Sequence, residues 1–79
     1  MKFGTWLDKR RVWDNPRGDF IKDARDDRRM PEDFATFDEL HSYLSSRRAC
    51  WQAIEVAGQV WNEYAEYVGK PSTGRRQLG

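Results

Sequence analysis

The most restrictive feature of this 79-residue sequence is an apolar stripe near its C-terminal end. Apolar and aromatic side chains recur there every three or four residues, at Ile54, Ala57, Trp61, Tyr64 and Val68. This spacing places them on one face of an α-helix. The stripe is widened by Ala53, Val56, Val60 and Tyr67. We predict a helix over 52–68, ended by Gly69 and Pro71 and contacted by other elements from two sides.

Three shorter helices are predicted over 3–11, 16–28 and 37–46. The second begins at Asn15-Pro16, because Asn is a favourable N-cap and Pro at the first helical position gives up no hydrogen bond. The third follows Thr36-Phe37-Asp38-Glu39, which matches the capping-box pattern. No stretch alternates polar and apolar residues long enough to indicate a strand. The predicted fold class is therefore all-α, with four helices.

The chain is long enough for a single domain, which we place at residues 1–69. Eleven aromatic residues can build its core without a disulfide, since Cys50 is the only cysteine. Gly18 lies inside a predicted helix, where glycine costs about 1 kcal/mol relative to alanine. We expect another helix to approach the chain closely there. Residues 70–79 have too few apolar side chains to fold, and we expect a flexible basic tail.

Several classes of function find no support in the sequence. It has no nucleotide-binding loop and no hydrolase motif, and its one histidine and one cysteine make no metal-ligand pattern. An enzyme would require His41 and Cys50 to meet by packing. We expect no catalytic site, no cofactor, no metal and no small-molecule substrate. The lone thiol and the lack of a long apolar run lead us to expect a cytoplasmic protein that does not enter a membrane.

Charge is distributed unevenly along the chain. Residues 1–31 carry a net charge of +3, residues 32–68 carry −5 and residues 69–79 carry +3. One interpretation is a polarised surface that meets an oppositely charged partner. The other is that solvated helix faces differ in charge without a partner.

The basic residues include many arginines, several of them in doublets beside tryptophan. Arginine grips phosphate with two parallel hydrogen bonds, and exposed aromatic rings stack on bases. Nine residues are therefore candidates for binding a partner or nucleic acid: Arg10, Arg11, Arg25, Arg28, Arg29, Arg47, Arg48, Trp13 and Trp51. Against nucleic acid stand thirteen acidic residues and a pI near 7.9.

Five short pieces of the sequence, in order, carry a resemblance to a known family. They are Phe3-x-x-Trp6-Leu7, Asn15-Pro16-x-Gly18-Asp19-Phe20, Met30-Pro31, the run from Thr36 to Leu44, and Trp61-x-x-Tyr64. Together they resemble the YozE-type family of small bacterial proteins with a sterile-alpha-motif-like (SAM-like) fold. The resemblance implies a compact four-helix domain, but the family is uncharacterised and supplies neither a function nor catalytic residues to carry over. Folds of this kind serve elsewhere as interaction modules, and some bind RNA hairpins.

The function we expect is a non-catalytic helical interaction module that binds a protein partner or itself. The alternative is a small nucleic-acid-binding protein that uses the arginine doublets.

Overall fold

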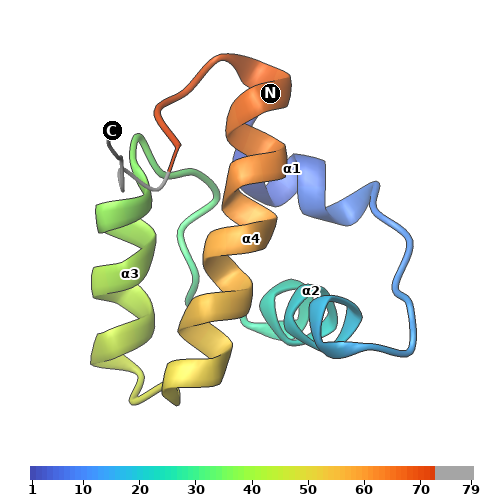
Figure 1. Cartoon of the computed structure of the whole chain (residues 1–79), viewed down its shortest axis with the longest axis vertical. Helices are drawn as coiled ribbons and strands as arrows, with labels where there is room; N and C mark the ends of the chain where they lie inside the picture. Colours follow the sequence, from blue (N-terminus) through green and yellow to red (C-terminus); the bar gives the residue numbers. More distant parts are fainter. Residues whose placement is uncertain (73–79) are drawn as a thin grey trace.

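The apolar stripe forms α4 (Trp51–Val68), the helix around which the other three are arranged in the computed structural model (Figure 1). Helices α1 (Phe3–Asp8) and α2 (Pro16–Asp26) lie on one side of α4, and α3 (Phe37–Ser46) lies on the other. The structure describes residues 1–72, and these form no strand. The predicted all-α, four-helix fold is confirmed.

Helices α1 and α2 end earlier than predicted, at Asp8 and Asp26 instead of residues 11 and 28. Helix α2 ends early at Asp27, whose backbone is extended. One carboxylate oxygen of Asp27 accepts the backbone N–H of Arg29, and the other accepts the hydroxyl of Tyr43 at 2.5 Å. Aspartate side chains compete with helical hydrogen bonds in this way. Tyr43 belongs to α3, so the bond also ties the end of α2 to that helix.

The helix ends use the predicted caps, with one difference. Asn15 accepts the backbone N–H of Gly18 at 2.8 Å, and Gly69 ends α4 in the left-handed conformation, with φ of 81°. The Thr36 hydroxyl accepts the N–H of Glu39 at 3.4 Å, as a capping box requires. The Glu39 carboxylate reaches back to the N–H of Ala35, at 2.9 Å, one residue before the expected donor.

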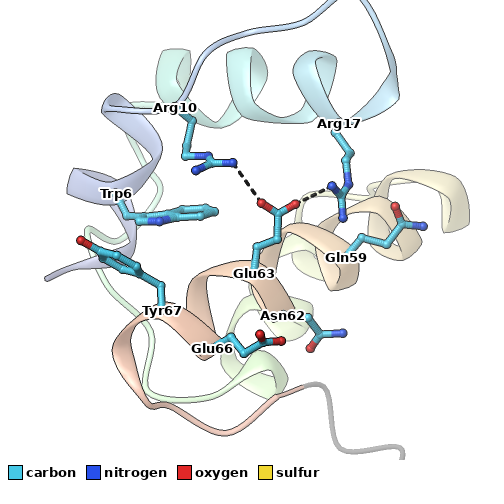
Figure 2. Close-up of a pocket in the computed structure, with 8 residues that line it drawn as sticks. All are labelled: Trp6, Arg10, Arg17, Gln59, Asn62, Glu63, Glu66 and Tyr67. Carbon is cyan, nitrogen blue, oxygen red and sulfur yellow. Dashed lines mark hydrogen bonds and ion pairs between the residues drawn. The ribbon is translucent and has the colours of Figure 1, made fainter.

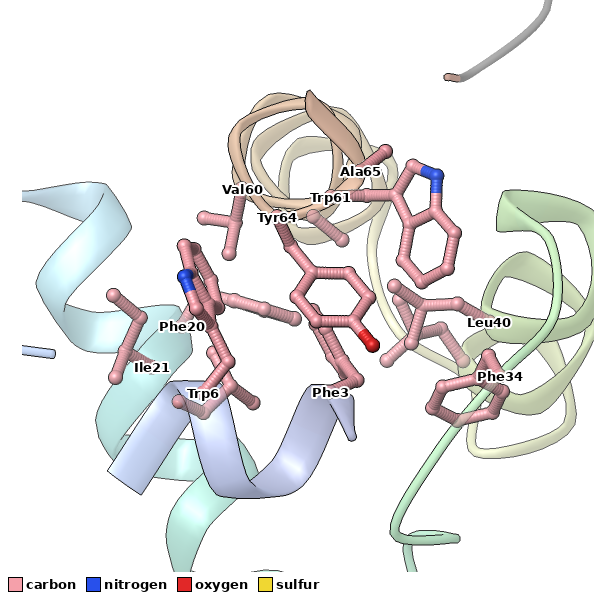
Figure 3. Packing of buried hydrophobic residues seen from close by; sticks show 13 residues of the cluster. Phe3, Trp6, Phe20, Ile21, Phe34, Leu40, Val60, Trp61, Tyr64 and Ala65 are labelled. Atoms are coloured by element: carbon pink, nitrogen blue, oxygen red, sulfur yellow. The ribbon is translucent and has the colours of Figure 1, made fainter. Parts of the chain in front are cut away.

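The core is centred on aromatic rings where α1 packs against α4 (Figure 3). Phe3 contacts Trp6, Trp61 and Tyr64, with ring centroids 5.1 to 6.2 Å apart. Leu40 of α3 closes the other side. All four helices therefore contribute buried side chains, as the two-sided stripe on α4 predicts.

Two residues of the predicted stripe, Ala53 and Tyr67, lie outside this core. Tyr67 is 67% exposed, because it occupies the edge of the α4 stripe beside α1, where no element covers it.

Gly18 is approached by a loop and not by a helix, which corrects our expectation. A Cβ atom at this position would lie 1.6 Å from the carbonyl oxygen of Trp13. That oxygen also accepts the backbone N–H of Asn15 at 2.9 Å. The loop before α2 therefore folds tightly onto the first turn of the helix. Only glycine leaves room for it.

Lys70 and Pro71, which follow α4, contact other parts of the domain. The Lys70 ammonium group donates to Asp33 at 2.7 Å and to the carbonyl of Phe34 at 2.9 Å. The next residue, Pro71, accepts a hydrogen bond from the Trp61 indole at 2.8 Å. These partners are distant in sequence, so composition could not indicate them. The remainder of the expected tail, residues 73–79, lies outside the described residues.

The ion pair of Asp33 makes stability depend on pH. Burial, the largest single influence, raises the pKa of this carboxyl, but hydrogen bonds outweigh it and lower the pKa from 3.8 to about 2. The donors are Lys70, Tyr64 and the backbone N–H groups of Phe3 and Phe34. A lowered folded-state pKa stabilises the fold above pH 4, and this stabilisation disappears as pH falls from about 4 through about 2.

We expect the loss to be about 1 kcal/mol, since the side chain is 40% exposed and solvent screens part of the interaction. Urea unfolding of wild type and Asp33→Asn at several pH values measures it. The variant is less stable at neutral pH, and its free energy of unfolding changes less below pH 4. If the free energies of unfolding of the two proteins change in parallel with pH, Asp33 is not the source of the pH dependence.

Candidate functional site

Two of the selected arginines connect helices through ion pairs. Arg10 donates to Glu63 of α4 at 3.0 Å, and its guanidinium lies 4.7 Å from the ring centroid of Trp6. Arg25 lies 3.8 Å from Asp8 of α1. The charges of these two arginines are thus partly compensated by carboxylates of the same domain.

A second group of arginines surrounds a shallow hollow of mixed charge. It is lined by Asp23, Asp26, Asp27, Arg28, Arg29 and Arg47. Arg47 lies 3.9 Å from Asp27 and 5.9 Å from the ring centroid of Tyr43. The hydrogen bond from Tyr43 lowers the pKa of Asp27, so this carboxylate stays ionised. Three acids oppose three bases here, and the hollow is not a positive patch.

The remaining selected residues occupy two separate turns. Arg11 stacks on Trp13 at 5.1 Å in the loop between α1 and α2. Arg48 precedes α4 with a positive φ of 61°, and Trp51 is the first residue of α4. Neither Arg11 nor Arg48 forms an ion pair within residues 1–72. The nine residues therefore do not converge on one face.

One groove, which we call the α1–α4 groove, combines aromatic and charged walls (Figure 2). Its lining consists of Trp6, Arg10, Arg17, Gln59, Asn62, Glu63, Glu66 and Tyr67. Glu63 lies between two arginines and pairs with both Arg10 and Arg17. These pairs hold the end of α1 and the start of α2 against α4. Sequence reasoning missed Arg17 and Glu63 as site residues, because Arg10 and its partner Glu63 are 53 residues apart. It assigned Tyr67 to the apolar stripe and not to a binding surface.

A second groove, the α3–α4 groove, is formed by the start of α3 and by α4. It is lined by Phe37, Asp38, Ile54, Glu55, Gly58, Gln59 and Asn62. Both charged residues are acidic, and neither Asp38 nor Glu55 forms an ion pair in the described part of the chain. Trp51 lies one turn before Glu55 on α4 and therefore extends this side of the helix. The groove presents an apolar floor with an acidic border.

Three large aromatic side chains are exposed beside these features. Trp13, Trp51 and Tyr67 are 58%, 69% and 67% exposed. The core is complete without them, and each leaves apolar area in water. Tryptophan and tyrosine are enriched among the residues that contribute most to protein–protein binding. These side chains are the strongest indication of a binding surface on the domain.

The two residues considered for catalysis are not paired. His41 packs edge-on against Phe37, with centroids 5.9 Å apart, and Cys50 is exposed before α4. No hydrogen bond between them occurs in the described structure. Within residues 1–72, no three metal-binding side chains are grouped, and no helix is long and apolar enough to cross a membrane.

A family model described as YozE SAM-like fold matches residues 3–66, which include α1, α2, α3 and most of α4. Neither the curated proteins nor the solved structures contain a match.

Proposed function

The chain belongs to the YozE SAM-like fold family, and we propose that this member is a non-catalytic helical module that binds a protein partner. The observation that carries the proposal is the exposure of Trp13, Trp51 and Tyr67 on a domain whose core is complete without them. Aromatic side chains held on rigid elements lose little conformational freedom on binding. They are therefore suited to anchor a partner.

The two grooves flanking α4 support the same proposal. Tyr67 borders the α1–α4 groove, and Trp51 extends the side of α4 that faces the α3–α4 groove. Interfaces typically place an aromatic anchor at the centre and polar groups around it. Each groove has polar and charged residues beside an aromatic one, so both have the composition of a peptide-binding or protein-binding surface.

Nucleic acid remains the second candidate, supported by the stacked pair of Arg11 and Trp13. Three observations favour protein over it. Residues 1–72 contain twelve lysines and arginines against thirteen acids. Arg10, Arg25 and Arg47 lie within ion-pair distance of carboxylates. The hollow that contains Arg28 and Arg29 has as many acids as bases.

An oligonucleotide titration separates the two candidates. Labelled single-stranded and duplex oligonucleotides are added at about 50 mM and about 200 mM salt while tryptophan fluorescence is followed. We expect no micromolar binding at the lower salt. Nucleic-acid binding would instead weaken steeply with salt, with a log–log slope of about 0.7–0.9 per neutralised phosphate. It would also be lost in Arg11→Ala.

We expect Trp51→Ala and Tyr67→Ala to lose partner binding while keeping their stability. Truncating an aromatic anchor costs on the order of 2 kcal/mol, or roughly thirtyfold in affinity. Quantitative affinity capture from host extract compares each variant with wild type and with Lys22→Ala, an exposed control on α2. The proposal would be contradicted if wild type and all three variants retain the same protein equally. It would also be contradicted if none of these four proteins retains a partner.

A further inference from the structure

The loop between α1 and α2 presents a basic and apolar surface. We call Lys9, Arg11, Val12 and Trp13 the basic corner. Val12 and Trp13 are exposed, and neither Lys9 nor Arg11 forms an ion pair within the described chain. The loop backbone is held in place, because the Trp13 carbonyl accepts the Asn15 N–H and lies against Gly18. The corner is therefore already ordered before it meets a partner.

The α3–α4 groove has the complementary character. Its charged residues are Asp38 and Glu55, both without an ion pair in the described structure, and no basic residue lines it. Phe37 and Ile54 are partly buried and supply apolar area to the floor. An indole flanked by cations suits this groove in both apolar character and charge.

The two surfaces are separate on the molecule, because the corner lies in the loop before α2 and the groove is formed by α3 and α4. The loop that carries the basic corner joins α1 to α2, and α3 lies across α4 from both (Figure 1). A corner therefore cannot reach the groove of its own chain. When the corner of one molecule occupies the groove of another, the first molecule still has a free groove and the second still has a free corner. Such a contact is heterologous and continues from molecule to molecule.

We infer that the basic corner of one molecule binds the α3–α4 groove of a second copy, so that the protein self-associates head to tail. The inference rests on the proposed function and names a second copy of the chain as the partner. Because a short loop enters a single groove, we expect the contact to bury less than about 1,200 Å² and the association to be weak and transient. Because lysine and arginine meet acids, salt weakens it.

Sedimentation at roughly 10 μM to 1 mM protein tests the inference, since weak complexes populate only in this range. At low salt we expect the average mass of wild type to rise with concentration past that of a dimer, and to fall when salt is added. The corner variant Arg11→Ala/Trp13→Ala and the groove variant Glu55→Lys each weaken association at least about tenfold. Asp23→Lys, with the same charge change at an exposed position of α2 outside both grooves, associates as wild type does. Circular dichroism establishes that every variant is folded.

Mixing the two defective variants gives the decisive result. One has an intact groove and the other an intact corner, so the mixture forms a heterodimer and stops there. The inference would be overturned if wild type stays monomeric or stops at a symmetric dimer. It would also be overturned if the corner variant and the groove variant both associate as strongly as wild type. If wild type is monomeric but still captures a protein through Trp51 or Tyr67, only this inference fails. If it is monomeric and captures none, the proposed function fails as well.

Discussion

Trp61→Ala is expected to lower the free energy of unfolding by about 3–5 kcal/mol. Trp61 is fully buried between α4 and α3, and its ring contacts Phe3 and Tyr64. Removing the indole leaves a cavity and leaves the Pro71 carbonyl without its donor. A 79-residue domain is stabilised by roughly 4–12 kcal/mol, at about 0.05–0.15 kcal/mol per residue. The variant should be largely unfolded or melt at least about 12 °C lower.

The matched control is Trp51→Ala, the same substitution at an exposed position of the same helix. Trp51 is 69% exposed, and Trp51→Ala should change stability by less than about 0.5 kcal/mol. Urea denaturation followed by circular dichroism compares the two variants with wild type. Equal losses at both positions would mean that the described core does not stabilise the protein.

Trp61→Phe separates the two contributions of this side chain. Phenylalanine retains much of the buried ring but cannot donate to Pro71. We expect an intermediate loss of about 1–3 kcal/mol, from the smaller ring and the unsatisfied carbonyl.

The helices were predictable from the sequence because their signals are local. The repeat that marks α4 lies within eighteen residues, and the caps at Asn15 and Thr36 act over three residues. The end of α2 was not predictable, because it depends on Tyr43, sixteen residues away from Asp27. The contacts of Lys70 with Asp33 span 37 residues and were missed for the same reason.

The candidate site was less predictable than the fold. Arginines can be identified as candidate binding residues from the sequence. Whether the charge of each arginine is neutralised depends on carboxylates that folding brings close to it. Arg10 and its partner Glu63 illustrate this, since they lie on different helices. The exposure of Trp51 also depends on how α3 and α4 are joined, because the ring lies at their junction. The apolar stripe marks Trp61 as buried, but Trp51 precedes the predicted helix, where the periodic pattern gives no information about burial.

Gly18→Ala is expected to destabilise the domain by about 3 kcal/mol or more, although it replaces a poor helix former with the best one. Helix propensity alone predicts a gain of about 1 kcal/mol. The steric argument predicts the opposite sign, because the new Cβ would lie 1.6 Å from the Trp13 carbonyl oxygen. Relief requires the backbone of the loop to move, which disturbs the Asn15 cap and the start of α2.

A second glycine supplies the control for this argument. At Gly69 no other atom lies within 4 Å of the place a Cβ would occupy, but φ is 81°, so Gly69→Ala tests backbone conformation without crowding. It should cost about 1 kcal/mol, the penalty for a left-handed residue with a Cβ. Thermal and urea unfolding of both variants measure the difference. A Gly18→Ala protein as stable as wild type would show that the loop does not pack on α2 in solution, and the ordered basic corner would lose its structural support.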